Sequence, residues 1–464
     1  MTLKKIVYPY IPNSAPEVKA QMLREVGAAN TEAFYEDVPA ALRFQGKMNL
    51  PEPFLSEYSL RRHVEGLLRK NTTAQQSLNF LGAGCYQHHV PAICDEVNQR
   101  GEFLTAYAGE PYDDHGRFQA LFEYCSMMGE LLEMDVVNVP NYDGFQASAT
   151  TLRMACRITG RNRVLLGGIL GGDKLSKIRD YLKPEIDIAM VEHDPQTGGM
   201  NLEHLEKLLK KERAAVYFEN PSYLGFLERR GAEITALAHQ QGALAIVSVD
   251  PISLGVLAPP ARYGADIVCG DIQPLGMHMQ FGGGQAGFIA SHDDVNIVNQ
   301  YPSRLFGISP TSVAGEYGFG DVAYERTSFA KREAGNEWVG TAAALWGITA
   351  GVYLALMGPQ GMKDIGEGIL YRTRYAMQEI GRIDGVRTNL FSTPHFKEFV
   401  VNFDGSGRKG ADINAALLRK GIFGGKDLSR DFPRLGESAL FCVTEVHTRA
   451  DIDRLASTLK EVLS

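Results

Sequence analysis

The chain has 464 residues, of which 44% are hydrophobic and 22% are charged. This composition is ordinary for a globular protein and excludes the collagen-like, disordered and disulfide-scaffold classes. The 47 Lys and Arg residues against 55 Asp and Glu residues give a net charge of −8, which argues against nucleic acid or an anionic membrane as a partner.

The six cysteines are scattered, without a CxxC pair or the spacing of a zinc site. The N-terminus has no apolar core of the kind that a signal peptide needs. Both features are typical of a reducing compartment, so the sequence predicts a cytoplasmic protein with free thiols and no metal site.

Residues 1–77 are predicted to form a helical N-terminal arm. Residues 16–27 have an amphipathic pattern that begins with Pro16 and ends with Gly27, as expected of a helix. A second helix is expected over 60–68.

Residues 78–335 alternate between apolar, β-branched runs and helical stretches. Strands are expected at 135–139, 163–166, 186–191, 214–218, 243–249 and 265–268, with helices at 148–159, 202–212 and 234–241. This alternation predicts a large α/β domain, in which right-handed βαβ units build a mostly parallel sheet covered on both faces.

Residues 336–464 are predicted to be a helical connection followed by a small C-terminal α+β domain. Its expected strands are 399–403 and 440–444, and its expected helices are 410–419 and 450–463. The stretch 338–362 carries no charge and is long enough to span a membrane. Because it is rich in Gly, Ala and Thr and contains Pro359, a buried helix is the better interpretation.

Polar side chains follow three of the predicted strands, namely Asn220, Asp250 and Asp271. Ligands bind at the carboxyl ends of strands in such sheets. An Asp in this place can pair with the protonated ring nitrogen of pyridoxal phosphate, or it can simply cap the next turn.

The segment from Tyr142 through Asp143 and Gly144 to Ser148 opens a helix after a predicted strand. A glycine followed by a hydroxyl residue at a helix N-terminus can cradle a phosphate. An ordinary N-cap explains the same residues.

This order of motifs is that of a fold-type-I pyridoxal phosphate enzyme, which also needs a lysine for the Schiff base. The expected place is 270–287, but no lysine occurs between Lys211 and Lys331. No nearby lysine is available to take its place, and His278 cannot form a stable imine.

Motifs along nearly the whole chain resemble one family, the glycine cleavage system P-protein, and within it subunit 1 (α) of the two-subunit glycine dehydrogenase (decarboxylating). They lie at 10–13, 49–52, 56–63, 80–86, 102–107, 134–135, 142–144, 352–359, 398–401, 420–425 and 442–445. The resemblance implies a fold-type-I architecture in which a β subunit holds pyridoxal phosphate on lysine, typically in an α2β2 assembly. It also implies that glycine is decarboxylated and its aminomethyl group passes to a lipoylated H-protein.

By offset along the family motif, Pro274 lies near the position of the lost lysine. The resemblance therefore implies that this chain has no catalytic residue and binds no cofactor itself. The expected vestigial cofactor pocket consists of Tyr142, Asp143, Gly144, Ser148, Asn220, Asp250 and Pro274.

The chain departs from the family pattern at 108–116, 276–280 and 335–341. Residues expected to face substrate or partner are Tyr107, Glu110, Asp113, His115, His278, Gly283, Gly284 and Gln285. The glycines of 281–287 permit a close approach to another subunit, although a tight turn between strands explains them equally.

Three alternatives follow from these departures. The chain could belong to a paralogous complex that acts on another amino acid or amine. It could be a stand-alone enzyme that uses the acid–base cluster from Glu110 to His115 for proton transfer or metal binding, unless that cluster is a polar surface loop. It could also be a purely structural interaction protein.

Overall fold

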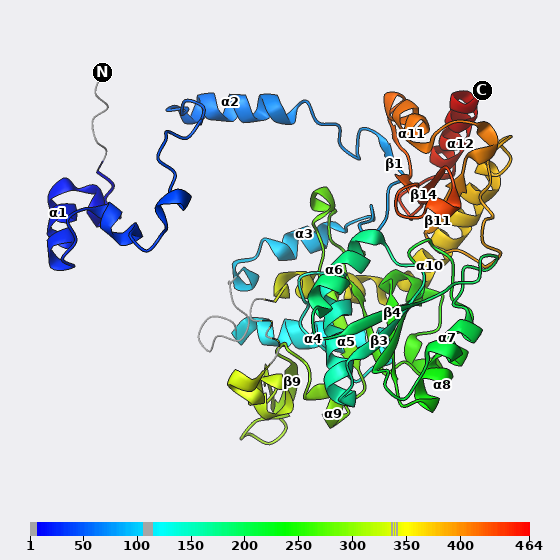
Figure 1. Cartoon of the computed structure of the whole chain (residues 1–464), viewed down its shortest axis with the longest axis horizontal. Coiled ribbons are helices and arrows are strands. Elements are labelled where there is room, and N and C mark those ends of the chain that lie inside the picture. Colours follow the sequence, from blue (N-terminus) through cyan, green and yellow to red (C-terminus); the bar gives the residue numbers. More distant parts are fainter. Residues whose placement is uncertain (1–6, 105–114, 336, 338, 340–341) are drawn as a thin grey trace. The chain divides into compact units, whose positions relative to one another are not determined.

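The computed structural model describes residues 7–104, 115–335, 337, 339 and 342–464, which fall into two compact units, 1–72 and 73–464 (Figure 1). In the first unit, α1 (Pro16–Glu25) begins at a proline whose fixed φ suits a first helical turn. Helix α2 (Glu57–Leu68) begins after Ser56, whose side chain accepts a hydrogen bond from the backbone of Ser59. None of residues 7–72 is buried.

In the described part of the second unit, seven strands form one sheet in the order β2-β8-β7-β6-β5-β3-β4. Neighbours from β4 to β7 are parallel, whereas β8 is antiparallel to both β7 and β2. The strands are β2 (Val136–Val137), β3 (Arg163–Gly167), β4 (Asp187–Val191), β5 (Ala215–Glu219), β6 (Leu244–Val249), β7 (Ile267–Asp271) and β8 (Gly287–Ser291). The predicted α/β architecture with a mostly parallel sheet is confirmed.

Helices cover both faces of this sheet. Successive side chains of a strand point to opposite faces, and here both faces carry apolar side chains that need to be buried. On β5, Val216 and Phe218 join one core and Ala215 and Tyr217 join the other. The first core is completed by α4 (His115–Leu132), α7 (Leu202–Leu208), α8 (Gly231–Gln240) and α10 (Ala344–Ile380), and the second by α5 (Gly144–Thr159), α6 (Gly172–Leu182) and α9 (Val295–Val298).

Strand register brings the carboxyl ends of β5, β6 and β7 to one edge. Glu219 pairs with Ser248, and Val249 pairs with Gly270. The residues that end these strands or follow them, Glu219, Asp250 and Asp271, therefore lie side by side at the edge where ligands bind in such sheets.

The C-terminal part packs on its own core around an antiparallel sheet in the order β11-β14-β13. Its elements are β11 (Glu398–Asn402), α11 (Gly410–Arg419), β12 (Ile422–Phe423), β13 (Lys426–Asp427), β14 (Ser438–Cys442) and α12 (Arg449–Leu463). Strand β1 (Leu78–Asn79) pairs with β12, so the segment that enters the large domain crosses the C-terminal part first.

The second unit also contains α3 (Ala92–Asn98) and the antiparallel hairpin of β9 (Phe306–Pro310) and β10 (Tyr317–Asp321). Helix α10 is interrupted at Gly358, whose φ of 58° and ψ of −177° lie outside the helical region, directly before Pro359. Among the described helices, none combines the length and apolarity that a membrane crossing needs. All six cysteines are free.

Candidate functional site

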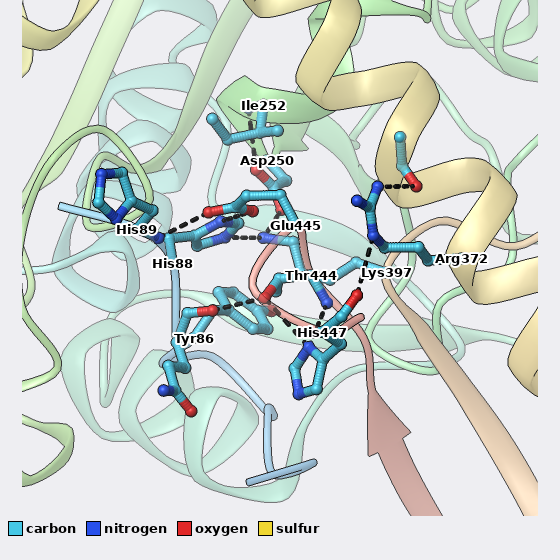
Figure 2. Close-up of polar contacts among 12 residues, drawn as sticks. Tyr86, His88, His89, Asp250, Ile252, Arg372, Lys397, Thr444, Glu445 and His447 are labelled. Atoms are coloured by element: carbon cyan, nitrogen blue, oxygen red, sulfur yellow. Dashed lines mark hydrogen bonds and ion pairs between the residues drawn. The ribbon is translucent and has the colours of Figure 1, made fainter. Parts of the chain in front are cut away.

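Asp250 follows β6 and both of its carboxylate oxygens are engaged within the chain. Oδ1 accepts a hydrogen bond of 3.0 Å from the backbone of Ile252, which caps the 3₁₀ helix Pro251–Gly255. Oδ2 forms an ion pair with the Lys397 ammonium (Figure 2). The local cap foreseen for this Asp is therefore present, together with a long-range partner.

Lys397 directly precedes β11 and is 1% exposed. Its φ is +65°, and the N–H of Glu398 donates to the carbonyl of Phe396 at 2.7 Å, which is the pattern of a γ-turn. A bulky residue rarely adopts a positive φ. Val443 donates to the Lys397 carbonyl at 2.8 Å, so the sheet holds this strained turn in place.

The ammonium of Lys397 also contacts His88 and Tyr86 (Figure 2). It lies 3.0 Å from His88 Nε2 and 3.7 Å from the centroid of the Tyr86 ring. Because an ammonium only donates, His88 Nε2 accepts and His88 Nδ1 donates to Glu445 Oε2 at 2.8 Å. Burial raises the pKa of Glu445, but its interaction with His88 and the N–H of His89 lower that pKa to about 2.

Glu398 lies beside this network and is 4% exposed. Its carboxyl accepts hydrogen bonds from the backbone of Ala83 at 2.6 Å and from the Tyr86 hydroxyl at 3.0 Å. Burial raises the pKa of Glu398 to about 7, although these hydrogen bonds and the charge of Lys397 act in the opposite direction.

The N-terminus of α5 is occupied by carboxylates of the chain itself. Asp143 is the N-cap and accepts from the backbone of Gln146 at 2.7 Å. The N–H of Gly144 donates to Asp271 at 3.0 Å, and the backbone of Gln273 donates to the same carboxyl at 2.8 Å. Burial raises the pKa of Asp271 to about 7.

A cavity of about 130 Å³ lies between these two groups. Two of its lining residues, Lys174 and Glu219, form an ion pair of 2.5 Å. Burial alone lowers the pKa of Lys174, but the carboxylate of Glu219 outweighs it and leaves that pKa raised. The lining further includes Tyr86, Gly144, Asp250, Asp271, Pro274, Gln285 and Glu398.

Of the residues predicted for the vestigial pocket, Gly144, Asp250 and Pro274 line this cavity. Tyr142 is 54% exposed. Ser148 is buried and donates to the carbonyl of Gly144 at 2.7 Å. The side-chain amide of Asn220 hydrogen-bonds to the backbone of Glu228: its oxygen accepts from the Glu228 N–H at 3.1 Å and its nitrogen donates to the Glu228 carbonyl at 3.3 Å.

The residues predicted to face substrate or partner are dispersed. Gln285 lines the cavity and donates to the carbonyl of Gly84 at 3.0 Å. His278 is exposed and pairs with Asp95 at 3.0 Å, Gly283 is exposed, and Gly284 is buried. Tyr107, Glu110 and Asp113, and the side chain of His115, lie outside the described residues.

Two lysines at or beside this cavity were not predicted from the sequence. Lys174 of α6 lines the cavity, and Lys397 of the C-terminal part pairs with Asp250, which lines it. The gap between Lys211 and Lys331 is real, but sequence distance does not measure distance in the fold. The apolar run 399–403 predicted a strand, and nothing in that run indicates where the side chain of Lys397 before it points.

The overall architecture matches solved structures of low sequence identity. A sphingosine-1-phosphate lyase of Burkholderia pseudomallei aligns with a TM-score of 0.66 at 14% identity, over 92% of this chain and 94% of that one. A NifS-like protein of Rickettsia africae aligns with a TM-score of 0.62 at 13% identity, over 83% and 99%. These likenesses are of fold alone. The chain has the α/β fold of fold-type-I pyridoxal phosphate enzymes.

The family follows from closer matches. The family model described as "Glycine cleavage system P-protein" matches residues 9–459, and the chain belongs to this family. It is similar to the probable glycine dehydrogenase (decarboxylating) subunit 1 of Staphylothermus marinus, with 37% identity over 98% of both chains. That of Moorella thermoacetica is 36% identical over 98% of this chain and 100% of its own. A crystal structure of an inhibitor-bound glycine decarboxylase (P-protein) aligns with a TM-score of 0.83 at 32% identity, over 98% and 100%.

The cofactor that this fold implies does not fit the residues present. Pro274, which lies near the position predicted for the Schiff-base lysine, has no free amine and lines the cavity. Asp250 is already paired with a cation, and a carboxylate takes the N–H of Gly144. The remaining space of about 130 Å³ is below the 300–1,000 Å³ typical of ligand pockets.

Proposed function

We propose that this chain is subunit 1 of a glycine dehydrogenase (decarboxylating) and acts only within a complex. The second subunit of this complex carries pyridoxal phosphate on a lysine. At that cofactor it decarboxylates glycine, and the aminomethyl group passes to a lipoylated H-protein. The observation that carries the proposal is the end-to-end match to relatives named subunit 1, at 36–37% identity. The misfit of the cofactor in this chain supports the division of labour.

In this account the chain contributes scaffold and surface. Its pocket is closed by ion pairs, and the complex is an α2β2 assembly in the cytoplasm, where the six free cysteines stay reduced. The exposed loop around His278 and Gly283 is the part of the sheet edge that we assign to partner contact. Phe281 in this loop is fully exposed, so its apolar ring is available for such a contact.

The test is a reconstitution with the second subunit and the lipoylated H-protein. Glycine-dependent exchange of labelled bicarbonate should require both subunits and should be absent with either one alone. Exchange by this chain without the second subunit would overturn the proposal. Exchange that responds to another amino acid in place of glycine would favour a paralogous complex, which the comparisons do not favour.

A further inference from the structure

We propose that side chains of this chain replace pyridoxal phosphate in its own pocket. The Lys397 ammonium takes the place of the cationic ring nitrogen of the cofactor, and the Asp271 carboxylate takes the place of its phosphate group. The two groups close the site to phosphorylated pyridines. The inference deepens the proposed function, since it gives a physical reason for the cofactor to reside on the second subunit.

At one end of the site, Asp250 has no free oxygen for a ring nitrogen. One oxygen caps its own turn and the other holds Lys397. A pyridinium that displaced Lys397 would leave the ammonium buried against His88 and Tyr86 without its counter-ion. An uncompensated buried charge is strongly unfavourable, so the internal pair excludes the ring.

At the other end, a carboxylate takes the hydrogen bond that a phosphate would receive from the α5 N-terminus. Gly144 donates to Asp271, and Asp143 accepts from Gln146. The fit between Gly144 and Asp271 is close, because a Cβ added at Gly144 would lie 3.1 Å from Asp271 Cβ. A phosphate would therefore meet two Asp side chains at a helix end where the N–H groups of Gly144 and Gln146 are already engaged.

The backbone at Lys397 indicates that its position is specified. A non-glycine residue in the left-handed region is strained, and such strain persists only where the surrounding structure imposes it. Here the γ-turn at Phe396–Glu398 and the hydrogen bond from Val443 impose it. The turn aims the side chain at Asp250, on the sheet edge of the large domain (Figure 2).

The experiment measures binding of pyridoxine 5′-phosphate to the full chain by titration calorimetry. This probe lacks an aldehyde, so it cannot react with surface lysines. The opened variant is Lys397→Ala combined with Asp271→Asn, and the matched control is Lys420→Ala, which removes a partly exposed lysine paired with Glu461. We expect at least ten-fold tighter binding to the opened variant than to the wild type or control, and loss of this gain when Asp250→Asn is added.

Equal affinity of the folded wild type and opened variant would overturn the inference, as would a gain that does not depend on Asp250. Because the opened variant could fail to fold, unfolding by urea is compared for Lys397→Met, Asp250→Asn and the double variant. We expect the double variant to be more stable than either single variant, since it removes both charges together. A double variant no more stable than the singles would contradict an internal ion pair.

The outcome is separable from that of the proposed function. Binding is measured on this chain alone, whereas the function is measured by exchange in the complex. A wild-type chain that binds the probe tightly while the complex still exchanges glycine carboxyl would remove the inference and leave the function standing.

Discussion

At the scale of single residues, a buried polar network lies along one side of the pocket. Glu445, His88, Lys397 and Asp250 form one continuous chain of contacts (Figure 2). Such networks are stable when complete and costly when one member is lost. Removing Lys397 leaves the Asp250 carboxylate without its counter-ion, whereas removing a surface lysine leaves no buried charge unpaired.

Lys397→Met should therefore lower the free energy of unfolding by about 3–5 kcal/mol, the range for breaking a buried ion pair. Lys420→Met breaks an ion pair whose side chains are 41% and 65% exposed, and should cost about 0–1 kcal/mol. Urea unfolding of the two variants beside the wild type measures both. Equal losses would show that the Lys397 pair is not buried in solution.

The raised pKa of Glu398 predicts a pH dependence of stability. Its native pKa of about 7 exceeds the unfolded value of about 4.3, so between these values the native state binds more protons. Stability from this group is therefore present at low pH and falls as pH rises toward and through about 7. The loss between about pH 5 and pH 8 should be about 3 kcal/mol.

Glu398→Gln should remove this part of the pH dependence, because the amide stays neutral throughout. Urea unfolding at several pH values, with the exposed Glu206→Gln of α7 as control, isolates the contribution. If wild type and Glu398→Gln lose the same stability from acid to alkaline pH, then Glu398 does not titrate in this range.

At the scale of elements, the regular strands and helices of the large domain could be predicted from the sequence. Apolar runs at 163–166 and 243–249 became β3 and β6 with shifts of about one residue. The prediction erred where context decides. The run 135–139 is a strand only at Val136–Val137, and β8 was not predicted, because it pairs antiparallel to β7 after a glycine-rich loop that no periodicity describes.

Helix α10 offers a test of its interruption. A Cβ at Gly358 would meet nothing within 4 Å, so Gly358→Ala probes the backbone alone. Its combination of φ and ψ is nearly confined to glycine, and the substitution should cost about 1–3 kcal/mol. Gly407 also has open space and a positive φ, but in the left-handed helical region.

Gly407→Ala should therefore cost less, about 1 kcal/mol. Thermal unfolding monitored by circular dichroism ranks the two variants. A Gly358→Ala variant as stable as the wild type would mean that α10 runs through this position without the break.

At the scale of the whole molecule, the candidate site joins segments that are far apart in the chain. His88, Asp250 and Lys397 come from three separate regions and meet only because β1 pairs with β12 and β11 begins beside the end of β6. The sequence predicted Asp250 and Gly144 from strand ends and helix starts, which are local features. It could not predict Lys397, whose role depends on how the C-terminal part packs.

Residues 7–72 expose large apolar side chains, among them Tyr10 at 97% and Leu55 at 85%. Surfaces of this kind mark protein interaction sites. Combining Leu55→Ser with Phe44→Ser should weaken co-purification with the second subunit at least ten-fold, while circular dichroism of the chain stays unchanged. A double Glu17→Gln, Glu25→Gln variant of α1 serves as the exposed control. Undiminished co-purification of the serine variant would contradict a contact between these apolar residues and the second subunit.

The division of labour between two subunits is tested most directly by locating the cofactor in the active complex. Borohydride reduction followed by peptide mass spectrometry identifies every lysine that carries a reduced pyridoxyl group. The account predicts stoichiometric label on one lysine of the second subunit and none on this chain. Label on Lys397, Lys174 or any other lysine of this chain, at a level that follows glycine exchange activity, would contradict it.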